Sequence, residues 1–207
     1  LLPAVRPATS SVSLTSDGEQ LASGSINWQP AISDDGRHVA FESTASELTG
    51  TSMTSMVFVR DRDADGDGVF DETEEGASVT TMVSVGNDGE PLDDGCEFPS
   101  ITGDGMLVSF HCRGADGVGD VGASDVFVHH RDLDDNGTFD ERGEGAFLTG
   151  LVSRAYDGAP GDGPSEFAEL SRDGNHVVFV ASAPNLVEGD SNGEPDIFVV
   201  SVPPALQ

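Results

Sequence analysis

The chain has 207 residues, the size of one ordinary domain, and carries 38 Asp and Glu residues against 9 Arg and no Lys, for a net charge of −29. Such a negative field repels phosphate backbones and anionic lipids, which argues against nucleic-acid binding, and no apolar run approaches the ~20 residues that span a bilayer. Short β-branched clusters, 26 Gly and 11 Pro instead favour an all-β protein with many turns. Leu1–Pro7 lacks a basic-then-apolar pattern, so we expect a signal peptide to be absent or already removed.

Taken in chain order, the predicted elements form an internal repeat. Three turn segments match, and their last residues, Gly36, Gly105 and Gly174, are 69 residues apart. Each turn is followed by an apolar-rich run and then by a second apolar strand. A Val-Ser pair with Asp-Gly close behind it precedes the first turn and follows the first and second repeats. The second strands contain Val57–Val59, Val126–Val128 and Ile197–Val199, and the pairs are Val12–Ser13, Val83–Ser84 and Val152–Ser153.

Each repeat therefore predicts four short strands, the sequence signature of a β-propeller blade. We expect the first blade over 28–86, the second over 97–155 and the third over 166–201, without its outer strand. An isolated outer strand is expected over 9–14, where the chain begins with the element that its last blade lacks.

At Pro30–Ser43 and Phe179–Val199 the chain resembles the TolB-type, WD40-like β-propeller repeat. The shared features are a Pro-x-Ile-Ser-x-Asp-Gly turn and an Asn-Leu-Val segment that leads to Asp-x-Phe-Val. The middle copy, Pro99–Val128, keeps the turn and strands but loses the Asn-Leu-Val segment. The resemblance implies a propeller fold and leaves the function open, because this family scaffolds many roles.

Three blades are too few to close a propeller, which typically has about 4–8. Two chains would supply six, and twofold assembly is the commonest form of homo-oligomer. The sequence therefore favours a homodimer in which the strand over 9–14 completes the last blade of the partner. The alternative is that the chain is a fragment of a longer propeller.

Two acidic loops follow the second apolar strand of the first two blades and fit the pattern D-x-D-x-[DN]-G-x-F-D. Oxygen ligands at alternate positions and a glycine that permits a sharp turn are typical of a Ca²⁺ loop. The expected ligands are Asp63, Asp65, Asp67, Asp71 and the Val69 carbonyl in the first loop, and Asp132, Asp134, Asn136, Asp140 and the Thr138 carbonyl in the second.

Glu74, Glu75 and Glu144 are candidates for a last carboxylate ligand. Because no helices flank the loops, they resemble the calcium loops of integrin-type propellers rather than EF-hands. The alternative is a solvated acidic hairpin tip, but two copies with one spacing favour about two Ca²⁺ sites per chain. Asp190 opens a weaker third candidate, which reads more readily as a turn.

Cys96 and Cys112 lie at equal distances from Asp104, so a hairpin would place them opposite each other. They could form a disulfide or remain two buried thiols. A disulfide would indicate an oxidising compartment, in agreement with loops that need millimolar external calcium.

The first strand of each blade would line an axial channel. Trp28, Glu97 and Glu166 align at one level, and Gln29, Phe98 and Phe167 align at the next. A sugar or a cationic peptide could bind where acids and aromatic rings meet, although the aromatic level is also explained by ordinary core filling.

No nucleophile elbow, zinc spacing, phosphate loop or dinucleotide fingerprint is present, so the catalytic residues are unknown and an enzyme is the less favoured reading. The sequence favours a non-catalytic, calcium-stabilised scaffold that recognises a protein or a glycan; the alternative is a hydrolase or lyase acting on glycans in the channel. The many acids and the absence of Lys resemble proteins of saline habitats. We expect an extracytoplasmic protein, periplasmic or secreted.

Overall fold

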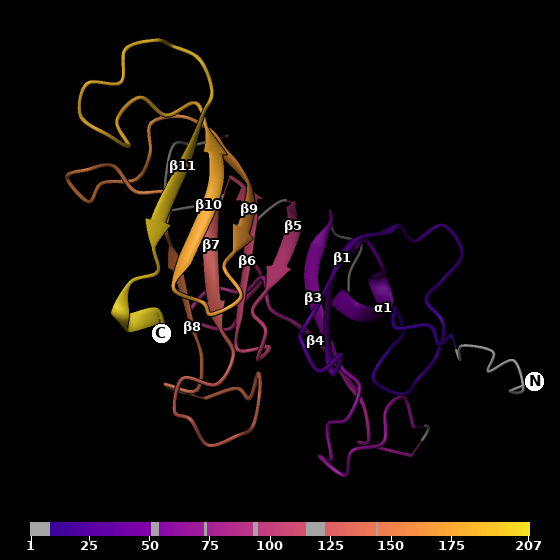
Figure 1. The fold of residues 1–207 in the computed structure, drawn as a ribbon. Coiled ribbons are helices and arrows are strands. Elements are labelled where there is room, and N and C mark those ends of the chain that lie inside the picture. Colours follow the sequence, from indigo (N-terminus) through magenta and orange to yellow (C-terminus); the bar gives the residue numbers. More distant parts are fainter. Residues whose placement is uncertain (1–8, 51–53, 73, 93–94, 115–122, 144) are drawn as a thin grey trace, which may run out of the picture.

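The computed structural model is a chain of three antiparallel sheets (Figure 1). It describes residues 9–50, 54–72, 74–92, 95–114, 123–143 and 145–207. The expected all-β class is confirmed, since the helical elements of these ranges are the four-residue α1 (Ser46–Thr49) and the 3-10 turn η1 (Pro204–Leu206). No helix in this part of the chain is long and apolar enough to cross a membrane.

The strands follow the chain within each sheet. Sheet 1 has the order β1-β2-β3-β4, sheet 2 the order β5-β6-β7-β8, and sheet 3 the order β9-β10-β11. Their bounds are β1 Asn27–Ile32, β2 His38–Ser43, β3 Met56–Asp61, β4 Val79–Met82, β5 Cys96–Ile101, β6 Leu107–Arg113, β7 Ser124–His130, β8 Leu148–Leu151, β9 Ser165–Leu170, β10 His176–Ala181 and β11 Asp196–Ser201.

A hydrogen-bonded Asp-Gly turn joins the first two strands of each sheet. In sheet 1, Asp35 Oδ1 accepts from Ser33 Oγ at 2.7 Å and from the Arg37 N–H at 2.9 Å. Gly36 follows with φ +77°, a left-handed conformation that a Cβ disfavours. Asp104 and Asp173 form the same turn in the other two sheets, so the local sequence repeat sets the strand register.

The sheets pack in series through their first strands. β5 contacts β1, β2 and β3, and β9 contacts β5, β6 and β7. One apolar core includes Phe58 and Phe110 from sheets 1 and 2, and a second includes Val126 and Phe179 from sheets 2 and 3. Each fully buried side chain of this kind stabilises the fold by about 1.5–3 kcal/mol.

The two ends of the series differ from its middle. Residues 9–13, part of the expected outer strand, lie in no strand of the described chain, and Leu14 makes an isolated bridge to Gln20. At the other end η1 folds back on β7 and β8, where the Leu206 side chain is buried. Sheet 3 has three strands in the described chain.

Candidate functional site

The first acidic loop, between β3 and β4, gathers three carboxylates. Ligand oxygens of Asp63, Asp65 and Asp67 all lie within 4.8 Å of one another. The Gly68 N–H donates to both oxygens of Asp63 at 3.2 Å, and the Val69 N–H donates to Asp67 Oδ1 at 2.8 Å. Three like charges this close repel one another, and a bound cation would remove that repulsion.

Asp71 does not join this group. Its carboxylate forms a two-point ion pair with Arg62, with Nε to Oδ1 at 2.9 Å and Nη2 to Oδ2 at 2.5 Å. Arg62 lowers the pKa of Asp71, and Ser10 Oγ donates to the same carboxylate at 2.6 Å. In this structure the Asp71 carboxylate anchors the loop to its own strand, and its role as a calcium ligand stays a prediction.

The candidates for a last carboxylate lie further out. Glu74 and Glu75 are exposed and line a hollow of about 530 Å³ whose wall includes Ser10 and the buried Arg60. Glu144 lies outside the described residues.

The second acidic loop, between β7 and β8, has the same hydrogen-bond pattern. The buried Asp132 accepts from the N–H groups of Asn136 at 3.1 Å and Gly137 at 2.9 Å, and the Thr138 N–H donates to Asn136 Oδ1 at 2.7 Å. One difference is chemical, because Asn136 Nδ2 donates to Asp134 Oδ2 at 3.0 Å. The Asn136 side-chain amide thus hydrogen-bonds a carboxylate of the second loop, whereas the corresponding residue of the first loop, Asp67, adds a further negative charge.

Asp140, the counterpart of Asp71, is held by Arg131. Arg131 Nε lies 3.0 Å from both carboxylate oxygens and Nη2 lies 2.6 Å from one, while Nη1 donates to the Gly105 carbonyl at 2.8 Å. Burial would raise the pKa of Asp140, but Arg131 and His129 outweigh it and hold the pKa below its usual value. The Phe139 ring lies between this guanidinium at 4.7 Å and His38 of the preceding sheet at 4.6 Å.

Sequence reasoning missed these two arginines, although a signal for them exists. Arg62 and Arg131 occupy the same repeat position, directly before the first Asp of each loop and nine residues before Asp71 and Asp140. An arginine and an aspartate that recur at the same spacing in two internal copies can indicate an ion pair between them, even where the aspartate also fits a metal-ligand pattern.

The third candidate loop forms an ordinary turn. Asn192 Nδ2 donates to Asp196 Oδ2 at 2.9 Å, the Asn192 N–H donates to Asp190 Oδ1 at 3.4 Å, and the Glu194 N–H donates to Asn192 Oδ1 at 2.9 Å. Among the described residues, no group of three acids that could hold a metal ion is found in this loop.

The first strands β1, β5 and β9 carry the aromatic level expected at the channel; we call their shared margin the first-strand edge. Gln29, Phe98 and Phe167 have positive φ values of 49°, 56° and 56°, each within a register irregularity of its strand pair. The Phe98 and Phe167 rings meet edge to face at 4.8 Å beside a hollow of about 400 Å³. Left-handed backbone is costly for bulky residues, so packing must hold these rings in place.

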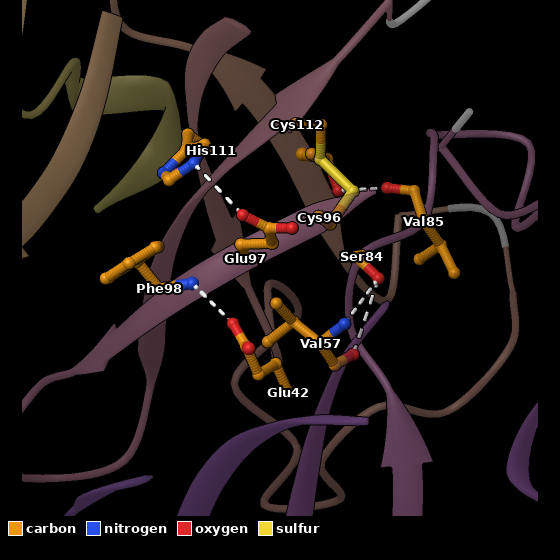
Figure 2. The surroundings of a disulfide bond; sticks show 10 residues. Glu42, Val57, Ser84, Val85, Cys96, Glu97, Phe98, His111 and Cys112 are labelled. Atoms are coloured by element: carbon orange, nitrogen blue, oxygen red, sulfur yellow. Dashed lines mark hydrogen bonds and ion pairs between the residues drawn. A yellow bond between two sulfur atoms is a disulfide. The ribbon is translucent and has the colours of Figure 1, made fainter. Parts of the chain in front are cut away.

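His111 links the acidic and aromatic levels of this edge (Figure 2). Its ring stacks on Phe98 at 5.3 Å, its Nδ1 accepts from the Phe167 N–H at 3.4 Å, and its Nε2 lies 3.9 Å from Glu97 Oε2. Burial lowers the pKa of His111 to about 4, so the ring is neutral at pH 7. Glu166 is also near this ring and accepts from Ser124 Oγ at 2.8 Å.

Glu42, on β2, is a second buried group that sequence reasoning missed. Its Oε2 accepts from the Phe98 N–H at 3.2 Å, and Figure 2 shows it below Glu97. Burial raises the pKa of Glu42, and the neighbouring Glu97 raises it further. Trp28, the third residue of the acidic level, pairs with Glu42 in register and is 60% exposed.

The two cysteines form a disulfide in the structure. Cys96 and Cys112 are register partners on β5 and β6, both are fully buried, and they are bonded to each other (Figure 2). The bond lies beside Glu97 and His111 and ties together the two strands that carry them.

Comparison with known proteins finds similar solved structures. No family model matches the chain, and no curated protein matches it. The crystal structure of TolB from Acinetobacter baumannii is similar at a TM-score of 0.45 and 16% identity, over 91% of this chain and 34% of that one. The chain thus spans about a third of the length of that structure.

Proposed function

We propose that the protein is a non-catalytic β-propeller module, stabilised by calcium, that binds a protein or a glycan. The series of sheets supports a propeller, because each later sheet lays its first strand against the sheet before it. Two chains would supply six such sheets.

The observation that carries a binding role is the first-strand edge. Trp28 and Phe167 are 60% and 50% exposed there. Phe167 follows Glu166 in the chain and contacts His111, whose Nε2 lies 3.9 Å from Glu97 Oε2. Uncovered aromatic rings next to acids suit the apolar face of a sugar or the side chains of a basic peptide.

Binding at this edge can be tested with glycan and peptide arrays in molar salt with calcium. We expect Phe167→Ser to abolish the strongest signals, because the ring supplies the exposed contact. Tyr156→Ser is the matched control, since Tyr156 is 70% exposed on a different hairpin. Equal signals from wild type and Phe167→Ser would contradict binding at the first-strand edge.

The aspartate group of the first loop supports a calcium site. We propose that Asp63, Asp65 and Asp67 hold one ion with the Val69 carbonyl, with Glu74 or Glu75 completing the shell. Asp132, Asp134 and Asn136 with the Thr138 carbonyl would hold the second. In both loops the ninth residue serves the arginine ion pair instead.

Calorimetry of the chelator-treated protein tests both sites, with about two Ca²⁺ per chain expected and little preference for Zn²⁺, which favours nitrogen and sulfur ligands. Asp65→Ala should remove the first site and leave the second, while Asp134→Ala should do the reverse. A folded apo protein that takes up no calcium would overturn the proposal for both loops.

Calcium and salt should also stabilise the fold. An ion present at 100 times its Kd adds about 2.7 kcal/mol, and molar salt shortens the Debye length to about 3 Å. We therefore expect a lower melting temperature in dilute buffer with chelator than in molar salt with calcium; equal temperatures would contradict this. The disulfide and the acidic composition support an extracytoplasmic, saline setting.

One observation favours the enzyme alternative. Glu42 has a raised pKa and lies near Glu97, and a carboxylic acid beside a carboxylate is the usual equipment of a glycan hydrolase. Turnover of a glycan by wild type that is lost in Glu97→Gln, with the fold intact, would select this alternative.

A further inference from the structure

Sheet 3 has one apolar face that the described chain leaves uncovered. Val178, Ile197 and Val199 on this face are 38%, 77% and 70% exposed. The corresponding repeat positions in the other two sheets are buried: Ala40, Val57 and Val59 in sheet 1, and Ser109, Val126 and Val128 in sheet 2. The face is therefore built for burial.

The repeat itself shows what covers such a face. β5 lies against β2 and β3 of sheet 1, and β9 lies against β6 and β7 of sheet 2. The residues of β5 and β9 that face the preceding sheet are buried: Cys96, Pro99 and Ile101, and Ser165, Ala168 and Leu170. Their counterparts on β1 are Asn27, Pro30 and Ile32, all exposed. Two surfaces of the kind that pack together between sheets are therefore exposed in the described chain: the apolar face of sheet 3 and the outer side of β1.

In sheets 1 and 2, two hydrogen bonds join the residues after the fourth strand to the backbone of the third strand; we call this pair of bonds a backbone clasp. After β4, the Val83 N–H donates to the Val57 carbonyl at 2.9 Å, and Ser84 Oγ accepts from the Val57 N–H at 3.0 Å (Figure 2). After β8, Val152 and Ser153 bond the backbone of Val126 in the same way, at 2.9 and 3.1 Å.

The third Val-Ser pair of the chain is Val12–Ser13, and the third receiving position is Ile197. These two places lie on opposite sides of the molecule, one near the N-terminal end and one on β11 (Figure 1). The Val12–Ser13 pair therefore does not form a clasp with Ile197 of its own chain in this fold. The pair and the strand position that would receive it are both present, but they lie far apart.

The segment after Val12–Ser13 already packs as if it arrived from a preceding sheet. Leu14 bridges Gln20 as Val85 bridges Pro91. The Leu14 carbonyl accepts from Thr80 Oγ1 at 2.8 Å, just as the Val85 carbonyl accepts from Thr149 Oγ1 at 2.7 Å. Residues 14–20 therefore pack on sheet 1 in the way that residues 85–91, an inter-sheet connection, pack on sheet 2.

We propose that the occupant of the sheet 3 face is a second copy of this chain. The copy lays its β1 on Val178, Ile197 and Val199, and its Val12–Ser13 clasps the backbone of Ile197. The contact is made twice, once in each direction, and closes a ring of six sheets. The inference rests on the propeller arrangement proposed above.

One internal bond has no counterpart in the contact between copies. Glu42 and His111 accept the N–H of Phe98 and Phe167, whereas the same position on β10 is Val180, which has no acceptor. Each copy also carries a charge of −29, so salt must screen their repulsion. The contact between copies should therefore be weaker than the internal ones and should tighten with salt.

Light scattering on the 207-residue chain in molar salt with millimolar calcium tests the proposal. The expected mass is twice the chain mass of 21.4 kDa. Val199→Glu should give the single-chain mass, because it buries a charge in the contact, while Val187→Glu, at a loop position 47% exposed, should stay a dimer. Circular dichroism checks that both variants are folded.

The clasp has its own test in the dimer dissociation constant. Ser13→Ala removes the hydroxyl acceptor at both contacts and should weaken association up to about tenfold per contact, while Ser13→Thr should retain most of it. An unchanged constant in Ser13→Ala would remove the clasp from the proposal.

A folded wild-type protein of single-chain mass, or an assembly larger than two chains, would overturn the ring. So would a dimer that Val199→Glu leaves intact. These outcomes are separate from the proposed function, because a monomer that binds calcium and ligand would refute only the second copy. A dimer that binds neither would refute only the binding role.

Discussion

The acidic loops and the first-strand edge treat buried ionisable groups in opposite ways. In the loops, Asp71 and Asp140 have lowered pKa values because an arginine pairs with each carboxylate. At the first-strand edge, burial lowers the pKa of His111 to about 4 and raises that of Glu42, and both shifts favour the neutral form. The charged forms of Asp71 and Asp140 are thus favoured by their arginine partners, whereas the neutral forms of His111 and Glu42 are favoured by burial.

The two loops also differ from each other in depth. The side chains of Arg62 and Asp71 are 18% and 19% exposed, whereas those of Arg131 and Asp140 are 1% and 6% exposed. The second loop abuts a preceding sheet through Phe139, and the first loop has no such neighbour among the described residues. The Arg–Asp ion pair that both loops share should therefore affect the free energy of unfolding more in the second loop than in the first.

The largest expected effect separates these two ion pairs. Arg131→Met leaves Asp140 as an uncompensated buried charge and should lower the free energy of unfolding by about 3–5 kcal/mol. Arg62→Met leaves Asp71 partly solvated and should cost about 1–2 kcal/mol. Urea unfolding in molar salt with calcium measures both variants.

Equal losses in Arg131→Met and Arg62→Met would break the distinction between the two loops. Arg131→Met combined with Asp140→Asn serves as the control, because removing both charges should recover most of the loss.

The second prediction concerns the pH dependence of the first-strand edge. The pKa of His111 is about 4 in the folded chain and 6.5 in the unfolded one, so between these values the unfolded chain binds more protons. Stability contributed by the neutral ring should therefore be lost as pH falls from 6.5 to about 4, by up to about 3 kcal/mol. Asp71 and Asp140 have lowered pKa values, so their contribution is lost only further down, as pH falls below 3.8.

His111→Asn isolates this step, since the amide oxygen can accept the Phe167 N–H but does not titrate. Urea unfolding at a series of pH values should give curves that converge as the pH falls to about 4. Curves that stay parallel through this range would show that His111 is not held neutral by burial.

The strands and the turns could be predicted because their signals are local. An Asp-Gly turn needs only neighbouring residues. The pairing of Cys96 with Cys112 also needs the register irregularity between Glu97 and Ser100, because the register next to the turn would place Cys96 opposite Arg113.

The arginine partners of Asp71 and Asp140 could not be predicted in this way. Both aspartates have a left-handed backbone, which sets the direction of the side chain, and a calcium-loop sequence pattern does not specify backbone conformation. The neutral His111 and Glu42 depended on burial between sheets, a long-range property that strand periodicity does not contain.

The smallest expected effect compares the two loops through one residue. Asn136→Asp gives the second loop the charge of the first and removes the Asn136 Nδ2 bond to Asp134. Because the charge of the ligands tunes calcium affinity, the second site should tighten by about tenfold, while the calcium-free protein becomes slightly less stable from added repulsion. The matched reverse change, Asp67→Asn, should weaken the first site by a similar factor. Calorimetry that found both affinities unchanged would mean that these positions do not face the ion. The expected opposite shifts would show that one carboxylate accounts for most of the difference between the two loops.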